Sequence, residues 1–153
     1  MAGSLTLAMI KPHTLFERKV GRIITHIEDS GFAIVMAAMK QLQREGAEEF
    51  YKEHAGKDFF QNLTRVMSSG PLWALVLSKP NAVEEWRTTI GSTEPSKAEP
   101  GTLRNLYGHH DNVTLNAVHG SATDFEAIRE INFFFGRELH VAGRVLGLDK
   151  NAR

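Results

Sequence analysis

Three short apolar segments in the first half of the chain place the strongest limits on its fold. They cover residues 4–10 (SLTLAMI), 32–39 (FAIVMAAM) and 72–77 (LWALVL). Glycine, serine or proline flanks each segment on at least one side, and runs of this length with such boundaries are typical of buried β-strands. The sequence therefore predicts a sheet whose strands are apolar over most of their length.

Helical patterns separate these segments. Apolar residues recur at helical spacing within 20–27, and further helices are expected over 45–53, 59–67 and 81–90, the last with Asn81 as its N-cap. A final helix is expected to begin at Ser121, which approximates a capping box with Asp124, and to continue past Gly136. With a short strand before His119, this order predicts one α+β domain over residues 1–153, in which helices cover one face of a four-stranded antiparallel sheet.

Residues 91–111 carry little periodicity and contain two prolines and three glycines. A segment of this length without regular structure is uncommon inside a compact domain, and it is usually either functional or disordered. Because the segment leads directly to Asn116 and His119, we expect it to be a functional loop.

Charge and cysteine content exclude several classes of protein. The 153 residues contain 18 Lys and Arg against 18 Asp and Glu, so no general basic face for nucleic acid or membrane lipid is expected. Without cysteine, the chain has no disulfide, no thiolate zinc site and no cysteine nucleophile. No apolar run reaches membrane-spanning length and no leader pattern opens the chain, which predicts a soluble, cytoplasmic protein.

The most informative short motif is Asn-Ala-Val-His-Gly-Ser at residues 116–121. It delivers one histidine, His119, to the end of a short apolar stretch just before a glycine. Histidine is well suited to take up and release a chemical group near neutral pH. The alternative is a strand end that happens to carry a histidine, so the surrounding residues have to decide between the two.

The chain has neither a Walker A loop nor a G-x-G-x-x-G motif, so any nucleotide phosphates must be held by side chains. Arginine suits this task because its planar fork donates two parallel hydrogen bonds to phosphate oxygens. Each candidate taken alone is equally consistent with an ordinary surface residue. The candidates are Lys11, Arg87, Thr93 and Arg104.

Other side chains could complete such a site. Phe59 with Leu63 suits an aromatic shelf for a base, or ordinary helix core. Glu130 could hold one imidazole nitrogen of His119 and leave the other as nucleophile, or it could be an exposed helix glutamate. The neighbouring His109 and His110 lack a third ligand at a recognised spacing, so we expect no structural zinc site there.

Taken together, these residues resemble the nucleoside diphosphate kinase family over nearly the whole chain, from Leu5 to about Phe135. The motif around His119 matches the family signature Asn-x-x-His-Gly-Ser. The other landmarks follow in the family's order: Ile10-Lys11-Pro12, Phe50-Tyr51, Phe59-Phe60, Ser69-Gly70-Pro71, Trp86-Arg87, Gly91-Ser92-Thr93-Glu94-Pro95 and Pro100-Gly101-Thr102-Leu103-Arg104.

This resemblance implies a ferredoxin-like α/β sandwich and a ping-pong phosphotransfer. His119 would carry the γ-phosphate of a nucleoside triphosphate to a nucleoside diphosphate, and Glu130 would orient it. Phe59 would stack on the base, with Leu63 beside it and Val113 opposite. The residues implied to contact phosphates, sugar or the reacting histidine are Lys11, Tyr51, Arg87, Thr93, Arg104 and Asn116.

In the family, Mg²⁺ is held largely by the nucleotide phosphates, so we expect no metal ligands from protein side chains. The resemblance also implies a homo-oligomer, either a hexamer, a tetramer or a dimer. Its expected partners are ATP and other nucleoside tri- and diphosphates.

The chain also departs from the family pattern. Ala122 stands where an aspartate usually follows the signature, Glu94 replaces an asparagine, and His13-Thr14 replaces Asp-Gly. The stretch from residue 104 to 116 looks slightly longer than usual. Two other functions therefore stay open: an inactive relative that binds nucleotide or acts as a scaffold, and a ferredoxin-like regulatory domain that binds no nucleotide.

Overall fold

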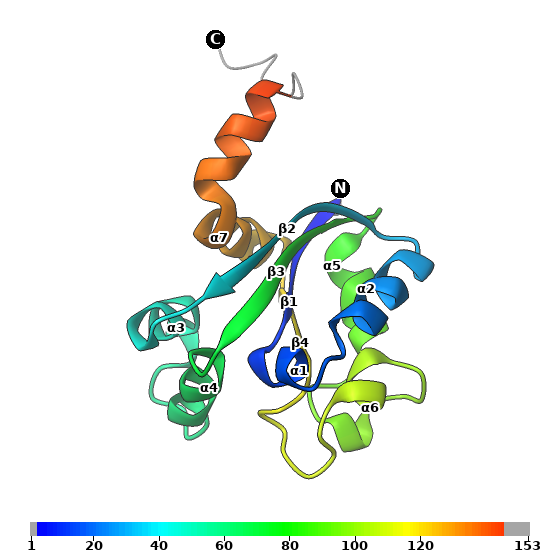
Figure 1. The fold of residues 1–153 in the computed structure, drawn as a ribbon, viewed down its shortest axis with the longest axis vertical. Coiled ribbons are helices and arrows are strands. Elements are labelled where there is room, and N and C mark those ends of the chain that lie inside the picture. Colours follow the sequence, from blue (N-terminus) through cyan, green and yellow to red (C-terminus); the bar gives the residue numbers. More distant parts are fainter. Residues whose placement is uncertain (1–2, 146–153) are drawn as a thin grey trace.

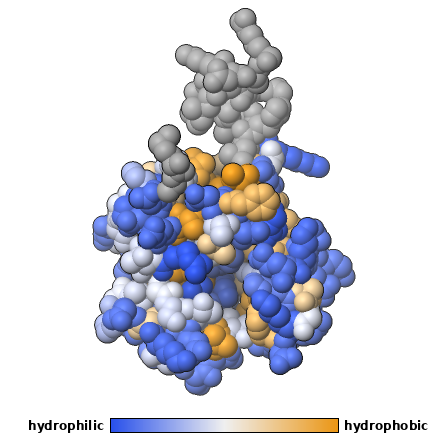
Figure 2. All heavy atoms as spheres, turned by 180° about the vertical axis from the view of Figure 1, so that it is seen from behind, coloured by the Kyte–Doolittle hydropathy of each residue, from blue (hydrophilic) through white to orange (hydrophobic). Residues whose placement is uncertain are grey.

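The computed structural model describes residues 3–145, with side chains described as far as residue 138. Residues 1–2 and 146–153, the ends of the predicted 1–153 domain, lie outside the described residues. Within residues 3–145, no helix combines the length and the apolar character needed to cross a membrane. Hydrophilic side chains dominate the face shown in Figure 2, and apolar ones form only small patches there.

Four antiparallel strands form one sheet in the order β2-β3-β1-β4, which confirms the predicted sheet (Figure 1). The strands are β1 (Leu5–Ile10), β2 (Ala33–Gln41), β3 (Pro71–Ser78) and β4 (Val118–Gly120). The short edge strand β4 pairs Met9 with His119. The sheet thus joins a segment near the start of the chain to the signature motif.

Helices and 3-10 turns connect the strands, and most lie close to their predicted ranges. They are α1 (Pro12–Phe16), α2 (Val20–Asp29), α3 (Arg44–Phe50), η1 (Lys52–His54), α4 (Phe60–Met67), α5 (Ala82–Ile90), η2 (Pro95–Lys97), α6 (Leu103–Tyr107) and α7 (Asp124–Val145). The predicted loop over 91–111 therefore contains two short helical segments. In α6, Leu103 is fully buried in the core. This packing stabilises a five-residue helix that the periodicity of the sequence does not indicate.

The prediction that helices cover only one face of the sheet is wrong. Successive side chains of a strand point to opposite faces, so Leu7 and Met9 pack against α3, α4 and α7, while Ala8 and Ile10 pack against α2, α5 and α6. Because β1 and β3 are apolar on both faces, each face needs its own cover.

Asn81 is the N-cap residue of α5, as predicted, but it has left-handed dihedral angles (φ 55°, ψ 44°) and its side chain makes no capping hydrogen bond. The predicted cap of the last helix is wrong. The hydroxyl of Thr123, not that of Ser121, accepts the backbone N–H of Glu126 at the start of α7 (3.1 Å). Asp124 accepts the backbone N–H of Gly3 (2.9 Å), and the described structure contains no capping-box bond between Asp124 and Ser121.

Candidate active site

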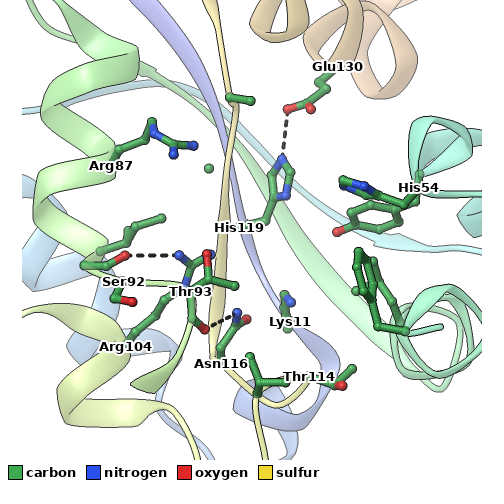
Figure 3. Close-up of a pocket in the computed structure, with 18 of the residues that line it drawn as sticks. Lys11, His54, Arg87, Ser92, Thr93, Arg104, Thr114, Asn116, His119 and Glu130 are labelled. Atoms are coloured by element: carbon green, nitrogen blue, oxygen red, sulfur yellow. Dashed lines mark hydrogen bonds and ion pairs between the residues drawn. The ribbon is translucent and has the colours of Figure 1, made fainter. Parts of the chain in front are cut away.

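A cavity of about 620 Å³ lies between α5 with the segment after it on one side and η1 with α4 on the other (Figure 3). The ends of β1 and β4 form its floor. Every residue that the sequence assigns to the site lines this cavity: Lys11, Tyr51, Phe59, Leu63, Arg87, Thr93, Arg104, Val113, Asn116, His119 and Glu130. The fold therefore brings together residues from the first and last parts of the chain.

The imidazole of His119 is held by one of its two nitrogens. Its Nε2 lies 2.9 Å from Oε1 of Glu130, and the same oxygen accepts the hydroxyl of Ser121 at 2.8 Å. Nδ1 has no hydrogen-bond partner among the described residues, and the ring reaches from β4 into the cavity (Figure 3). A carboxylate on Nε2 favours the tautomer that leaves a lone pair on Nδ1.

The charge on Glu130 is stabilised where it lies. Burial acts to raise its pKa, but the charge of His119 and the hydrogen bonds from His119 and Ser121, with Arg129 nearby, outweigh burial and lower it. Glu130 is therefore an ionised carboxylate in the neutral range, although its side chain is only 2% exposed. The hydroxyl of Ser121 donates a hydrogen bond to this carboxylate, a role that the local sequence does not indicate.

The backbone around His119 is tightly fixed. The indole N–H of Trp86 donates to the carbonyl of His119 at 3.0 Å. A Cβ on Gly120 would come within 2.9 Å of Cδ1 of Trp86 and 3.0 Å of Cδ1 of Ile90. Glycine is thus needed here because α5 packs closely against β4.

Two residues before the histidine, the chain makes a strained turn. Ala117 has φ of 73°, and the N–H of Val118 donates back to the carbonyl of Asn116 at 2.9 Å, which is the pattern of a γ-turn. The carbonyl of Ala117 accepts the N–H of Lys11 (2.9 Å) and the hydroxyl of Thr14 (3.0 Å). These bonds hold a conformation that costs an ordinary residue energy, and such strain is common at functional sites.

A buried lysine and a partly buried arginine line the cavity. Lys11 is 4% exposed, and burial, with a smaller effect from Arg104, lowers its pKa to about 7. Burial also lowers the pKa of Arg104, to about 10. The guanidinium of Arg104 donates to the carbonyls of Gly91 (3.1 Å) and Val118 (3.0 Å). An anion in the cavity would stabilise both charged forms.

Several buried polar atoms around the cavity have no hydrogen-bond partner within the described part of the chain. They are the hydroxyl of Tyr51, Nε of Arg104 and Oδ1 of Asn116. Burial, followed by the charge of Glu130, raises the pKa of Tyr51, so its hydroxyl keeps its proton and remains a donor. Unsatisfied buried groups of this kind are costly, and a polar ligand would satisfy them.

The same cavity also contains an apolar slot. Phe59 is 45% exposed and Val113 is 46% exposed, although both line the cavity with Leu63. The ring of His54 contacts Phe59 edge to face, with ring centroids 5.3 Å apart, and stacks on Tyr51. His54 lies opposite His119 in Figure 3.

No local sequence pattern marks His54 as a site residue. The other lining residues without a predicted role are Glu53, Ile90, Gly91, Ser92, Thr114, Gly120 and Ala122.

No group of three or more His, Cys, Asp or Glu side chains that could hold a metal ion occurs in the part of the chain that the structure describes. His109 contacts the carboxylate of Glu17, and Nε2 of His110 lies 2.9 Å from the carbonyl of Asn105, so these two histidines serve different partners.

The departures from the family pattern fall in different places. Ala122 lines the cavity, whereas Glu94 forms an ion pair with Lys97 (3.0 Å) and is not part of the lining. His13 accepts the backbone N–H of Ala117 at 3.2 Å through Nε2, and burial, followed by the charge of Lys11, lowers its pKa to about 4. His13 is thus a neutral acceptor that supports the strained turn.

A carboxylate-held imidazole that shares a cavity with basic side chains, in an antiparallel α+β fold, defines the class as a phosphate-handling transferase. Comparison with known proteins gives the family. The family model described as nucleoside diphosphate kinase matches residues 4–139. The chain belongs to the nucleoside diphosphate kinase family, which is a family of phosphotransferases.

Individual relatives agree with this assignment. A nucleoside diphosphate kinase of Histophilus somni is 48% identical over 130 residues, which is 85% of this chain and 91% of that protein. One from Legionella pneumophila is 45% identical over 135 residues, which is 88% of this chain and 94% of the relative. The structure of the Halobacterium salinarum nucleoside diphosphate kinase in complex with CDP superposes with a TM-score of 0.82 at 34% identity, covering 88% of each chain.

Proposed function

We propose that this protein is a nucleoside diphosphate kinase that works by a ping-pong mechanism through a phosphohistidine at His119. The observation that carries the proposal is the geometry of that imidazole: Nε2 is bonded to Glu130, and Nδ1 is left without a partner in the described structure. Nδ1 would attack the γ-phosphorus of a nucleoside triphosphate, and the bond to the β-phosphate oxygen would break. A second nucleoside diphosphate would then take the phosphoryl group from Nδ1 through its own β-phosphate oxygen.

The surrounding side chains support this chemistry. Phosphoryl transfer depends mainly on in-line positioning and on neutralising charge on the transferring oxygens. Lys11, Arg87 and Arg104 supply positive charge, and the hydroxyls of Tyr51 and Thr93 supply donors. Asn116 fixes the wall near Thr93, whose carbonyl accepts its amide N–H at 3.0 Å, and its free Oδ1 suits a sugar hydroxyl.

The slot formed by Phe59, Leu63 and Val113 would hold the base. Apolar and aromatic surfaces recognise the π-face and the shape of a base, and they do not read its hydrogen-bonding edge. The enzyme should therefore accept purine and pyrimidine nucleotides, with ribose or deoxyribose, as donors and acceptors.

We also propose that Mg²⁺ enters the cavity bound to the nucleotide. The cavity fits this role: Lys11 and Arg104 line it, and Glu130 is committed to His119 and Ser121, so the ion would be held largely by phosphate oxygens. Bound there, the ion would neutralise part of the phosphate charge. Chelation by EDTA should abolish phosphorylation of the protein, and excess Mg²⁺ should restore it.

The proposal extends to the rest of the predicted organisation: one kinase domain over residues 1–153, located in the cytoplasm and assembled as a homo-oligomer. The family match over residues 4–139 supports the domain assignment. Light scattering coupled to size-exclusion chromatography would separate a hexamer, a tetramer and a dimer.

Labelling with [γ-³²P]ATP and Mg²⁺ tests the central step. Wild-type protein should acquire an acid-labile, base-stable label and should pass it to a deoxynucleoside diphosphate. His119→Ala should lose the label, whereas His110→Ala, a matched change at an exposed histidine outside the cavity, should keep it.

Failure of the wild-type protein to label would overturn the proposal. Binding of nucleoside diphosphate without any exchange would instead indicate an inactive relative, and Ala122 in the cavity wall is the feature that makes this the second candidate. The absence of any thermal shift with Mg²⁺-ADP would favour a regulatory domain that binds no nucleotide.

A further inference from the structure

The apolar slot has two walls that come from distant parts of the chain. Phe59 and Leu63 belong to the α4 side, and Val113 belongs to the segment that leads to β4. One side-chain hydrogen bond joins these walls directly: the amide Nδ2 of Asn62 donates to Oγ1 of Thr114 at 2.8 Å, across 52 residues of sequence. Thr114 also lines the cavity, near Asn116 (Figure 3).

Neighbouring bonds orient both partners. Oδ1 of Asn62 accepts Nη2 of Arg65 at 2.6 Å, so the amide nitrogen is turned toward Thr114. The backbone N–H of Thr114 donates to Oδ1 of Asn112 at 3.2 Å, which fixes the start of the wall. Thr114 is only 9% exposed, so its hydroxyl bonds in a place largely shielded from competing water.

We propose that the bond between Asn62 and Thr114 is a latch that holds the slot at the width of a nucleotide base. Asn62 and Thr114 act as positioning residues: the first lies one residue before Leu63, and the second one residue after Val113. The inference rests on the proposed function, because it is there that the slot is assigned to the base.

The physical basis is preorganisation. Phe59 and Val113 are each nearly half exposed, so packing alone does not fix the distance between the walls. Without the latch, the segment that carries Val113 would have to become ordered when the base binds, and that ordering reduces affinity. The phosphate end of the cavity has its own fixed points, such as the bond from Asn116 to the carbonyl of Thr93. The latch should therefore affect the base and not the phosphates.

Calorimetry on Thr114→Val, Asn62→Ala and the double variant tests this division. Mg²⁺-ADP is the ligand with a base, and Mg²⁺-tripolyphosphate is the ligand without one. Each single variant should bind ADP about two- to tenfold more weakly, which is the usual contribution of one hydrogen bond. The double variant should be no weaker than the weaker single variant, because both changes remove the same bond. Affinity for tripolyphosphate should stay the same in all three.

Two further variants serve as controls. Thr114→Ser keeps the hydroxyl and should keep the wild-type affinity for ADP. Thr25→Val removes an exposed hydroxyl that bonds only within α2, and it should change neither affinity.

Several results would overturn the latch. One is an unchanged affinity for ADP in Thr114→Val, and another is equal losses in Thr114→Val and Thr114→Ser. A loss in Thr114→Val without one in Asn62→Ala would mean that the hydroxyl contacts the nucleotide directly. Equal losses for ADP and tripolyphosphate would mean a general structural role. Failure of the proposed function is distinguishable, because wild-type protein would then fail to acquire label from [γ-³²P]ATP.

Discussion

The floor of the cavity and its apolar slot are built in different ways. On the floor, Lys11 is 4% exposed and the side chains of His119 and Glu130 are 14% and 2% exposed. In the slot, Phe59 and Val113 are 45% and 46% exposed. On the floor, Lys11 follows β1, His119 lies on β4 and Glu130 lies on α7. In the slot, Phe59 and Leu63 come from the start and the middle of α4, and Val113 comes from the segment before β4.

The difference fits the proposed roles of the two parts. Transfer of a group between two atoms requires positions fixed to a fraction of an ångström, and the floor reaches this by redundant bonding and a strained turn at Ala117. Holding any of several bases requires an apolar surface of the right spacing, which partly exposed side chains can supply. Disturbing the floor should therefore reduce turnover, and disturbing the slot should reduce affinity.

Removing charge from the floor should have the largest effect. Lys11→Met should lower kcat/KM about 100- to 1,000-fold, because a preorganised charge near the transferring phosphate is lost. The measurement is a coupled assay with ATP and a deoxynucleoside diphosphate. Lys52→Met, at an exposed lysine outside the cavity, should leave kcat/KM unchanged, and a similar loss there would contradict the assignment.

The same substitution should stabilise the protein in a pH-dependent way. Burial lowers the pKa of Lys11 to about 7 from 10.5, so between these values the unfolded chain holds a proton that the native chain lacks. The destabilisation by Lys11 is complete below pH 7 and declines as the pH rises toward 10.5. Lys11→Met should melt well above the wild type at pH 6, with a smaller difference at pH 9. A constant difference would contradict this.

Disturbing the orientation of the imidazole should have the next largest effect. Glu130→Gln should lower kcat about 10- to 100-fold, because the neutral amide stabilises the Nε2–H tautomer less well. The Kd for ADP, measured by calorimetry, should stay within about twofold. Glu28→Gln, at an exposed position on α2, is the matched control. An unchanged kcat in Glu130→Gln would remove its orienting role.

A change in the slot should show the opposite pattern. Phe59→Ala should raise the KM for nucleotides about 5- to 10-fold through lost stacking, with a smaller change in kcat. Steady-state kinetics with a purine and a pyrimidine nucleotide measure both constants. Equal losses in kcat and KM would indicate that Phe59 is structural and not a base shelf.

Relaxing the strained turn should have the smallest effect. Ala117→Gly relieves the left-handed conformation but makes the unfolded chain more flexible, so the free energy of unfolding should rise by less than about 1 kcal/mol. Turnover should fall by less than about threefold. Urea denaturation and the coupled assay check the two values, and a clear loss of stability would mean that the turn is not strained.

Much of the fold followed from local pattern. The apolar runs over 4–10, 32–39 and 72–77 became β1, β2 and β3 with boundaries shifted by one or two residues. The segment over 91–111 was harder, because η2 and α6 are each about one helical turn long and owe their stability to tertiary packing. The packing of helices on both faces of the sheet was also not predicted, because the pattern of each strand was considered separately.

The site shows the same limit. The resemblance to the family grouped Lys11, His119 and Glu130, and the structure places all three around one cavity. It did not reveal what Ser121 contacts, because that depends on α7 returning Glu130 to the sheet. Nor could it reveal Thr114, whose partner Asn62 lies 52 residues away. Contacts across such distances have no local signature.

The place of His119 on the edge strand also has a consequence for biosynthesis. β4 needs β1, made more than 100 residues earlier, and Glu130 is added eleven residues after the histidine. At a typical translation rate those eleven residues take about one second. A nascent chain that has bound nucleotide through its earlier residues would still lack an oriented imidazole until Glu130 has been added, so the proposed phosphate carrier should become competent only once α7 has packed against the sheet.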